Sequence, residues 1–297
     1  MKTLQTSIRS FAADSLPSLR EHSWLALISF TYLLAAILVS IRFEAPINVS
    51  ALVVNSLGTA VISLVFLFCA YAIFVMVFVR PARLTLFLMA GVRDYVTRER
   101  LLHALPMLLL IPVFTSAFGL FKAAIPFVNP YAFDIQIAEW DRLLHGGQHP
   151  WTLLQPLVGY PVVTAIINVC YHLWFFVMLA MLYWLIGSLT NRQLRMQFLL
   201  SFALTWILLG TMGATWLSSV GPCYYGYLIL GDNPFAPLME YLRSANEHFP
   251  IWALDVQKLI WHSYQNRASE TAWGVSAMPS LHVATSTLFA LDRKSVV

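Results

Sequence analysis

The chain has 297 residues, of which 59% are hydrophobic and 11% charged, and its mean hydropathy is +0.70. Soluble domains carry about 25% charged residues, so this composition excludes an ordinary soluble protein. The net charge of +4 comes without a block of like charges, which argues against a nucleic-acid partner. The three cysteines form no Cys-x-x-Cys pair and no Cys/His metal spacing, so we expect no disulfide framework, no metal and no other cofactor.

The apolar residues come in runs long enough to cross a membrane. They predict an all-α, polytopic transmembrane helical bundle with about six spans, the last of them incomplete: Trp24–Ile41, Leu52–Val79, Leu101–Leu120, Val162–Gly187, Met196–Ser219 and a span that starts near Pro279. We expect a cytoplasmic amino-terminal segment (1–23), amino-terminal transmembrane helices (24–121), a second membrane domain (122–291) and a short tail (292–297).

The basic residues predict how the spans are oriented, because cytoplasmic loops are enriched in Lys and Arg. They gather in three segments, namely the amino terminus, the loop after the second span and the loop after the fourth: Lys2, Arg9 and Arg20; Arg80, Arg83, Arg93, Arg98 and Arg100; Arg192 and Arg195. All three segments lie on one side if every span crosses, so we expect that side to be cytoplasmic. Segments 122–161 and 220–278 then lie on the outer face.

Each outer segment contains a stretch with the spacing of an amphipathic helix that lies in the membrane plane. The first stretch places apolar residues three and four positions apart, at Phe133, Ile137, Trp140 and Leu144. The second places them at Trp252, Val256, Leu259 and Ile260. Two interpretations stay open at this point: a lid that packs over the bundle without chemistry, or a lid that also shapes a substrate site.

Among the eight histidines, His282 has the surroundings of a functional residue. Pro279 suits the first turn of a helix, and the apolar run after it makes that helix a span entering from the outer face. Helix N-termini attract anions, phosphate above all, and a free N–H group near Ser280 would face such a ligand. An imidazole there can bind a phosphoryl oxygen or protonate a leaving alkoxide. Ionisable residues at membrane depth are functional candidates, whereas the other histidines favour structural roles.

The stretch "AMPSLHVATSTLFAL" resembles the second signature of the type 2 phosphatidic acid phosphatase superfamily, which is Pro-Ser-Gly-His at a helix start. With leucine in place of the glycine, it is similar to inositol phosphorylceramide synthases and their bacterial relatives. Three further stretches fit that inositolphosphotransferase branch in their order along the chain: "WDRLLHGGQHPWTLLQP", "CYHLWFF" and "SVGPCYYGYL". The resemblance covers Phe133 to Leu291 and implies that segment 122–291 is a phosphatase or phosphotransferase domain.

The resemblance implies metal-free phosphoryl transfer through a phosphohistidine. In the family, a histidine of the third signature, His-x-x-x-Asp, attacks phosphorus while the aspartate orients it. The histidine of the second signature protonates the leaving lipid oxygen, and water or an acceptor alcohol then takes the phosphoryl group. Mapped onto this sequence, His282 is the catalytic acid and Ser280 lies near the phosphate.

The first family signature, a lysine a fixed distance before Arg-Pro, is absent. The single Arg-Pro of the chain is Arg80-Pro81, on the predicted cytoplasmic side, with an isoleucine where the lysine should stand. Positive charge for the phosphate then has to come from other residues, and the candidates are Arg142, His145 and His149. Arg142 could equally pair with a nearby aspartate or anchor at lipid head groups.

The third signature has no counterpart, because no histidine follows His282. A helix from Pro279 to Leu291 rises about 20 Å, short of the roughly 30 Å hydrocarbon core. The charges that follow would then lie at membrane depth, and "DRKSVV" resembles one reading frame of a widely used sequencing adapter. We expect residues 292–297 to be non-native and the chain to be truncated before a returning span with His-x-x-x-Asp. A genuine but degenerate family member is the alternative.

These patterns together predict an integral membrane lipid phosphatase or phosphotransferase, with its amino terminus in the cytoplasm and its site on the extracytoplasmic face of the plasma membrane. The expected partner is a membrane lipid substrate: a lipid phosphate, a polyprenyl diphosphate or a phosphoinositol-bearing lipid. We expect this fragment to be inactive, since it lacks the nucleophile. The alternative is a non-enzymatic lipid-binding or transporter-like membrane protein in which His282 packs or relays protons.

Overall fold

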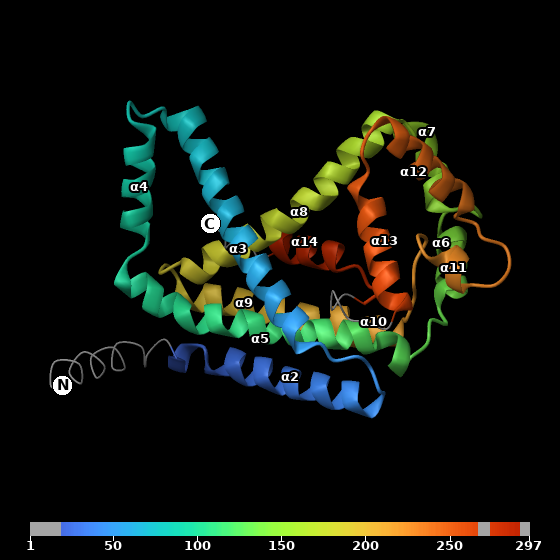
Figure 1. Cartoon of the computed structure of the whole chain (residues 1–297), viewed down its shortest axis with the longest axis horizontal. Helices are drawn as coiled ribbons and strands as arrows, with labels where there is room; N and C mark the ends of the chain where they lie inside the picture. Colours follow the sequence, from blue (N-terminus) through green and yellow to red (C-terminus); the bar gives the residue numbers. More distant parts are fainter. Residues whose placement is uncertain (1–18, 267–273, 292–297) are drawn as a thin grey trace.

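A computed structural model describes residues 19–266 and 274–291 of the chain (Figure 1). Helices make up 79% of the structure, and no strand occurs in the part described, which confirms the predicted all-α polytopic bundle. Five helices are long and apolar enough to cross a membrane: Ser23–Arg42, Leu52–Val79, Arg98–Val128, Pro161–Gly187 and Arg192–Trp216. The predicted tail 292–297 and most of the predicted segment 1–23 lie outside the described residues.

The elements follow one another in a simple order. The amino-terminal half holds α2 (Ser23–Arg42), α3 (Val49–Phe74) with a π-helical end (Val75–Val79), α4 (Leu84–Tyr95) and α5 (Arg98–Val128). Two further spans are α8 (Pro161–Gly187) and α9 (Arg192–Ile207), and α9 continues through a π-helical segment (Leu208–Gly213) into α10 (Ala214–Trp216). The shorter helices are α6 (Asp134–Leu144), α7 (Pro150–Val158), α11 (Tyr225–Leu228), α12 (Ala236–His248), α13 (Trp252–Gln265) and α14 (Leu281–Leu291).

Helix α5 is longer than the predicted span Leu101–Leu120. It begins after the N-cap Thr97, whose hydroxyl accepts from the Arg100 amide at 3.2 Å, and it runs through three internal prolines to Val128. Membrane helices tolerate proline where side chains and neighbours satisfy the freed backbone groups. The longer helix places Lys122, which the sequence assigned to an outer segment, inside the span.

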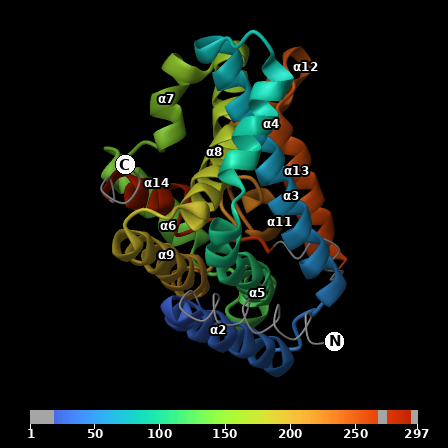
Figure 2. The same ribbon diagram turned by 90° about the vertical axis from the view of Figure 1, so that its left-hand side faces the viewer.

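The spans share one apolar core between α2, α5, α8 and α9. Helix α2 lies along α5, as both views show (Figure 1, Figure 2). The buried residues of the main core cluster come from all four helices and include Leu25, Leu110, Leu182, Phe198 and Phe202. Close packing of such side chains, rather than hydrophobic transfer from water, holds helices together in lipid. Many apolar residues on the outward faces of α2 and α3 stay exposed, as suits contact with lipid chains.

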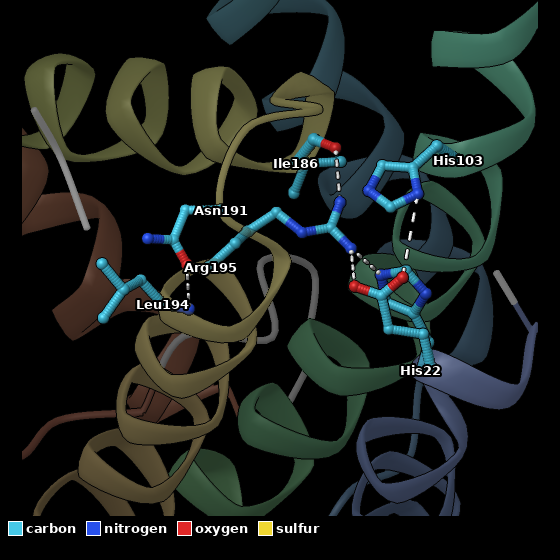
Figure 3. Close-up of polar contacts among 7 residues, drawn as sticks. His22, His103, Ile186, Asn191, Leu194 and Arg195 are labelled. Atoms are coloured by element: carbon cyan, nitrogen blue, oxygen red, sulfur yellow. Dashed lines mark hydrogen bonds and ion pairs between the residues drawn. The ribbon is translucent and has the colours of Figure 1, made fainter.

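A buried polar cluster joins the spans at the end where α2, α5 and α9 begin (Figure 3). The Arg195 guanidinium donates to the Glu21 carboxylate at 2.8 Å, lies 3.1 Å from His22 Nε2, and donates to the Ile186 carbonyl at 3.4 Å. His103 lies 3.9 Å from the same carboxylate. Residues from two of the three basic segments, Glu21 and Arg195, and His103 just after the other segment therefore meet at one end of the bundle.

This cluster predicts a large effect of removing its central cation. Arg195→Leu leaves the Glu21 carboxylate without its ion-pair partner in a largely buried position, and we expect a loss of about 3 kcal/mol in unfolding free energy. Arg192→Leu, at an exposed position one turn earlier, is the matched control and should stay within about 0.5 kcal/mol of the parent. Unfolding of the detergent-solubilised protein measures both, and equal stability of the two variants would contradict the structural role of the cluster.

The shorter helices α6, α7, α11, α12 and α13 gather at the opposite end of the bundle (Figure 1). In α6 the buried residues are Asp134 and Ala138, while Trp140 and Leu144 of the predicted apolar stripe are exposed. Phe133 and Ile137 of the same stripe are half-buried, so only its second half faces away from the protein, where a helix in the membrane plane would meet lipid. We call this group of helices the outer cap.

Candidate active site

The loop before α14 is fixed to the rest of the protein by several backbone contacts. The Ala277 amide donates to the Ser219 carbonyl at 3.0 Å, and the Tyr131 hydroxyl donates to the Val275 carbonyl at 3.0 Å. Gly274 lies so close to α5 that a Cβ at this position would overlap the Lys122 carbonyl. The loop therefore sets where α14 begins relative to α5 and α9.

A buried carboxylate holds the turn that receives this loop. Asp134 is 4% exposed, and its carboxylate accepts from the Val220 amide at 3.0 Å and from the Gly221 amide at 2.9 Å. Burial raises the pKa of the Asp134 carboxyl, and the hydrogen bonds from the two amides oppose that rise. Gly221 has a φ of +76°, and a side chain there would also meet Ala277, so this turn requires glycine.

Helix α14 begins two residues after Pro279, and Ser280 caps it. The Ser280 hydroxyl accepts from the Val283 amide at 3.4 Å, which satisfies one of the free donors of the first turn. His282 is the second residue of the helix, as the motif predicts for its first turn. The Leu281 side chain packs where Gly210 leaves room, since a Cβ on Gly210 would approach it to 2.9 Å.

His282 lines a cavity of about 590 Å³ that is mostly apolar. Its ring stacks on Tyr171 of α8 with 4.5 Å between centroids, and the adjacent His172 lines the same cavity. The His172 Nδ1 atom lies 2.7 Å from the Asn168 carbonyl and donates to it, which fixes the orientation of the ring. The fourth group of this polar end is Lys122 of α5, whose Nζ lies 3.4 Å from the Ser276 carbonyl.

The outer cap also contributes to the cavity, through α13. Val256 and Ile260, two members of its predicted apolar stripe, line the cavity, whereas Trp252 and Leu259 are exposed. Helix α13 therefore forms part of the cavity wall, as the interpretation of a lid that also shapes a site expects. No α6 residue lines this cavity.

The three predicted phosphate ligands besides Ser280 lie elsewhere on the outer cap. Arg142 pairs with Glu139 on its own helix, with N–O distances of 2.7 and 2.8 Å, and both side chains are exposed. His145 Nδ1 lies 2.7 Å from a carbonyl of the preceding turn, and the His149 ring lies 5.5 Å from Phe235. None of the three lines the cavity. Their role as phosphate ligands stays a prediction.

Lys122 is the residue that the sequence reasoning missed, and a signal for it existed. It is the single Asp, Glu, Lys or Arg between Arg100 and Asp134, in an otherwise apolar run. An ionisable residue inside a span marks a candidate site by default. Ending the predicted span at Leu120 hid that signal. Within the described ranges, no group of three or more His, Cys, Asp or Glu residues could hold a metal ion.

A comparison with protein families places this site in a known group. The model of the PAP2 superfamily matches residues 135–295, just over half of the chain. The chain belongs to the PAP2 superfamily. No curated protein and no solved structure gives a significant match. The PAP2 match confirms the superfamily predicted from the His282 motif and makes the chain a lipid phosphatase-type membrane protein.

The PAP2 match begins in α6, so α2, α3, α4 and α5 precede it. At its other end it reaches residue 295, beyond the described residues. The cavity nevertheless has walls from both parts: α2, α3 and α5 before the match, and α8, α9, α13 and α14 within it. The site of this PAP2 protein is thus built by the matched domain together with the helices that precede it.

From the hydrogen bonds between Asp134 and this turn, we predict that a substitution away from the cavity wall lowers the stability of the protein. Asp134→Asn puts an amide nitrogen beside backbone N–H donors, and we expect a loss of about 2 kcal/mol in unfolding free energy. Asp141→Asn, exposed on the same helix, is the control and should change stability by less than about 0.5 kcal/mol. Thermal unfolding in detergent measures the difference, and an Asp134→Asn variant as stable as the control would contradict the proposed hold on the turn.

Proposed function

We propose that this PAP2 protein is a lipid phosphatase or phosphotransferase that works through a phosphohistidine, with His282 as the general acid. The observation that carries the proposal is that His282 stands at the start of a helix and lines a large apolar cavity next to a lysine and a second histidine. An apolar chamber with a few convergent polar groups is the usual form of a site for an amphipathic ligand.

The proposed reaction has two steps. A histidine nitrogen attacks phosphorus, the bond from phosphorus to the lipid oxygen breaks, and His282 gives its proton to that oxygen. Water or an alcohol then attacks the phosphohistidine, and His282 takes back a proton from the attacking hydroxyl. The attacking histidine of His-x-x-x-Asp has no counterpart after His282 in the 297 residues. Neither step needs a metal or another cofactor.

Within the superfamily, we propose the inositolphosphotransferase branch that resembles inositol phosphorylceramide synthases. The support is Leu281, which stands where the common signature has glycine and which packs into the space above Gly210. The substrate would be a lipid phosphate, a polyprenyl diphosphate or a phosphoinositol-bearing lipid.

The domain boundary predicted at residue 122 lies inside helix α5 and would divide it. We therefore propose that the catalytic part begins at residue 135, where the family match starts.

We also propose that the amino terminus is cytoplasmic and that His282 acts on the extracytoplasmic face of the plasma membrane. The basic residues of three segments support this orientation, and Glu21 and Arg195 from two of those segments meet His103, three residues after the remaining one, at one end of the bundle. The start of α14 lies with the outer cap at the other end (Figure 1).

An activity measurement tests the function. Sequencing the source gene beyond the Leu291 codon identifies any His-x-x-x-Asp motif, and the protein carrying it is assayed for phosphate release from phosphatidic acid in mixed micelles. His282→Ala should lower turnover by about 10²- to 10⁴-fold, the usual worth of a general acid. His248→Ala, an exposed histidine of α12, is the control and should keep full turnover.

The 297-residue chain should release no phosphate in the same assay, because no histidine follows His282. Turnover by this chain alone, or full turnover by His282→Ala, would show the mechanism to be wrong. A gene that ends without His-x-x-x-Asp would favour the alternative, a non-enzymatic lipid-binding or transporter-like protein that uses the same cavity.

A further inference from the structure

Lys122 has an unusual environment for a charged residue inside a span. It lies in α5, six residues before the helix ends, and it lines the apolar cavity. Its Nζ donates to one backbone carbonyl, that of Ser276, at a long distance of 3.4 Å. No carboxylate of the described residues forms an ion pair with it. A cation in low dielectric without an anion is costly, so the site favours an anionic ligand.

The position of Lys122 relates directly to that of His282. Ser276, its hydrogen-bond partner, belongs to the loop that leads into α14, four residues before the cap Ser280. The close approach of Gly274 to the Lys122 carbonyl fixes the same loop two residues before Ser276. Lys122 and His282 therefore border one end of one cavity, where the first turn of α14 adds its free N–H groups. A phosphate at this end would meet a cation, an imidazole and a helix N-terminus.

The cavity continues from this polar end deep into the bundle. Along α5 its lining runs from Lys122 back to Met107, which corresponds to about 22 Å of helix. The hydrocarbon core of a bilayer is about 30 Å thick, so the cavity extends through much of it. Leu25 and Ser29 of α2 and Leu199 of α9 line it near the ends where those helices begin. Where α3 and α5 bring hydroxyls to the wall, Ser56 and Thr115 bond to each other at 2.8 Å, so the wall stays effectively apolar.

We infer that the helices before the family match bind the substrate. Lys122 contacts its phosphate, and the chamber between α2, α3, α5, α8 and α9 holds one long hydrocarbon chain of the same molecule. The inference rests on the proposed function in taking a lipid phosphate as the ligand. It adds that Lys122 of α5 takes the place of the lysine that is missing from the first family signature. It also adds that the hydrocarbon chain of the lipid lies inside the bundle rather than along its outer surface.

Binding by the 297-residue chain tests the role of Lys122 without any turnover. The probes are hexadecyl phosphate, hexadecanol and inorganic phosphate, added to the detergent-solubilised protein, and ligand-dependent thermal stabilisation gives the affinities. Lys122→Gln should bind hexadecyl phosphate about 10- to 100-fold more weakly, the worth of a hydrogen bond to a charged group, and should bind hexadecanol like the parent. Lys122→Arg keeps the charge and should lose about threefold or less. Inorganic phosphate alone should give no stabilisation.

Photolabelling tests where the hydrocarbon chain of the ligand lies. Hexadecyl phosphate with a diazirine at the far end of its chain should label residues deep in the chamber, such as Met107, Leu182 and Tyr183. Ser29→Phe fills the deep end and should abolish this label. Thr31→Phe, an exposed position on the same helix, is the matched control and should leave the label unchanged.

The outcomes separate this inference from the proposed function. Unchanged affinity of Lys122→Gln for hexadecyl phosphate would overturn the role of Lys122. Label confined to lipid-facing residues such as Phe30 and Leu34 would overturn the chamber. In either case the parent protein still binds the lipid phosphate and the proposed function stands. If the parent binds hexadecanol and hexadecyl phosphate equally, both the inference and the lipid-phosphate function fail. Equal stabilisation by inorganic phosphate and by hexadecyl phosphate would overturn the binding of the hydrocarbon chain in the chamber.

Discussion

The end of the bundle that holds α6 and the start of α14 depends on a carboxylate that accepts hydrogen bonds from a turn far away in sequence. Asp134, at the start of α6, binds the amides of Val220 and Gly221, and that turn in turn receives the Ala277 amide through Ser219. The chain enters α14 directly afterwards. Because membrane helices pack by shape, with little hydrophobic force to position them, such polar contacts decide where a functional helix begins. The position of His282 relative to α8 therefore depends on this interaction together with the other contacts of the loop before α14.

The basic residues within the spans have different partners at the two ends of the bundle. At the end where α2 and α9 begin, Arg195 has the Glu21 carboxylate as its partner and further contacts from neighbouring segments. Such an ion-paired cluster holds the helices together. At the other end Lys122 has one distant carbonyl and an apolar wall. Both are basic residues within spans, yet among the described residues only Arg195 has a carboxylate partner, which gives it a structural role and leaves Lys122 as the candidate for ligand binding.

The spans could be predicted from the sequence because hydropathy is a local property of each segment; four of the first five agree with the structure to within a few residues, and the third continues eight residues past its predicted end. His282 could be predicted from its position after Pro279. The gathering of Lys122, Tyr171 and His172 around it could not, because those residues come from helices whose faces only packing orients. Lys122 was hidden further by a helix that continues past Leu120. Arg142 shows the opposite limit. Its partner Glu139 lies on the same face of the helix, and spacing alone could not decide whether Arg142 would bind this carboxylate or a substrate phosphate.

The shared wall of the cavity has a consequence for inhibitors. A compound that reached only the first turn of α14 would meet the motif that defines the superfamily, and many related enzymes would offer it the same groups. A compound that extended past His282 towards Ser29 and Met107 would contact helices that precede the family match. Its affinity would then be decided by residues outside the signature of the superfamily. In this protein, the amino-terminal helices are therefore where such a compound could gain selectivity over other members of the superfamily.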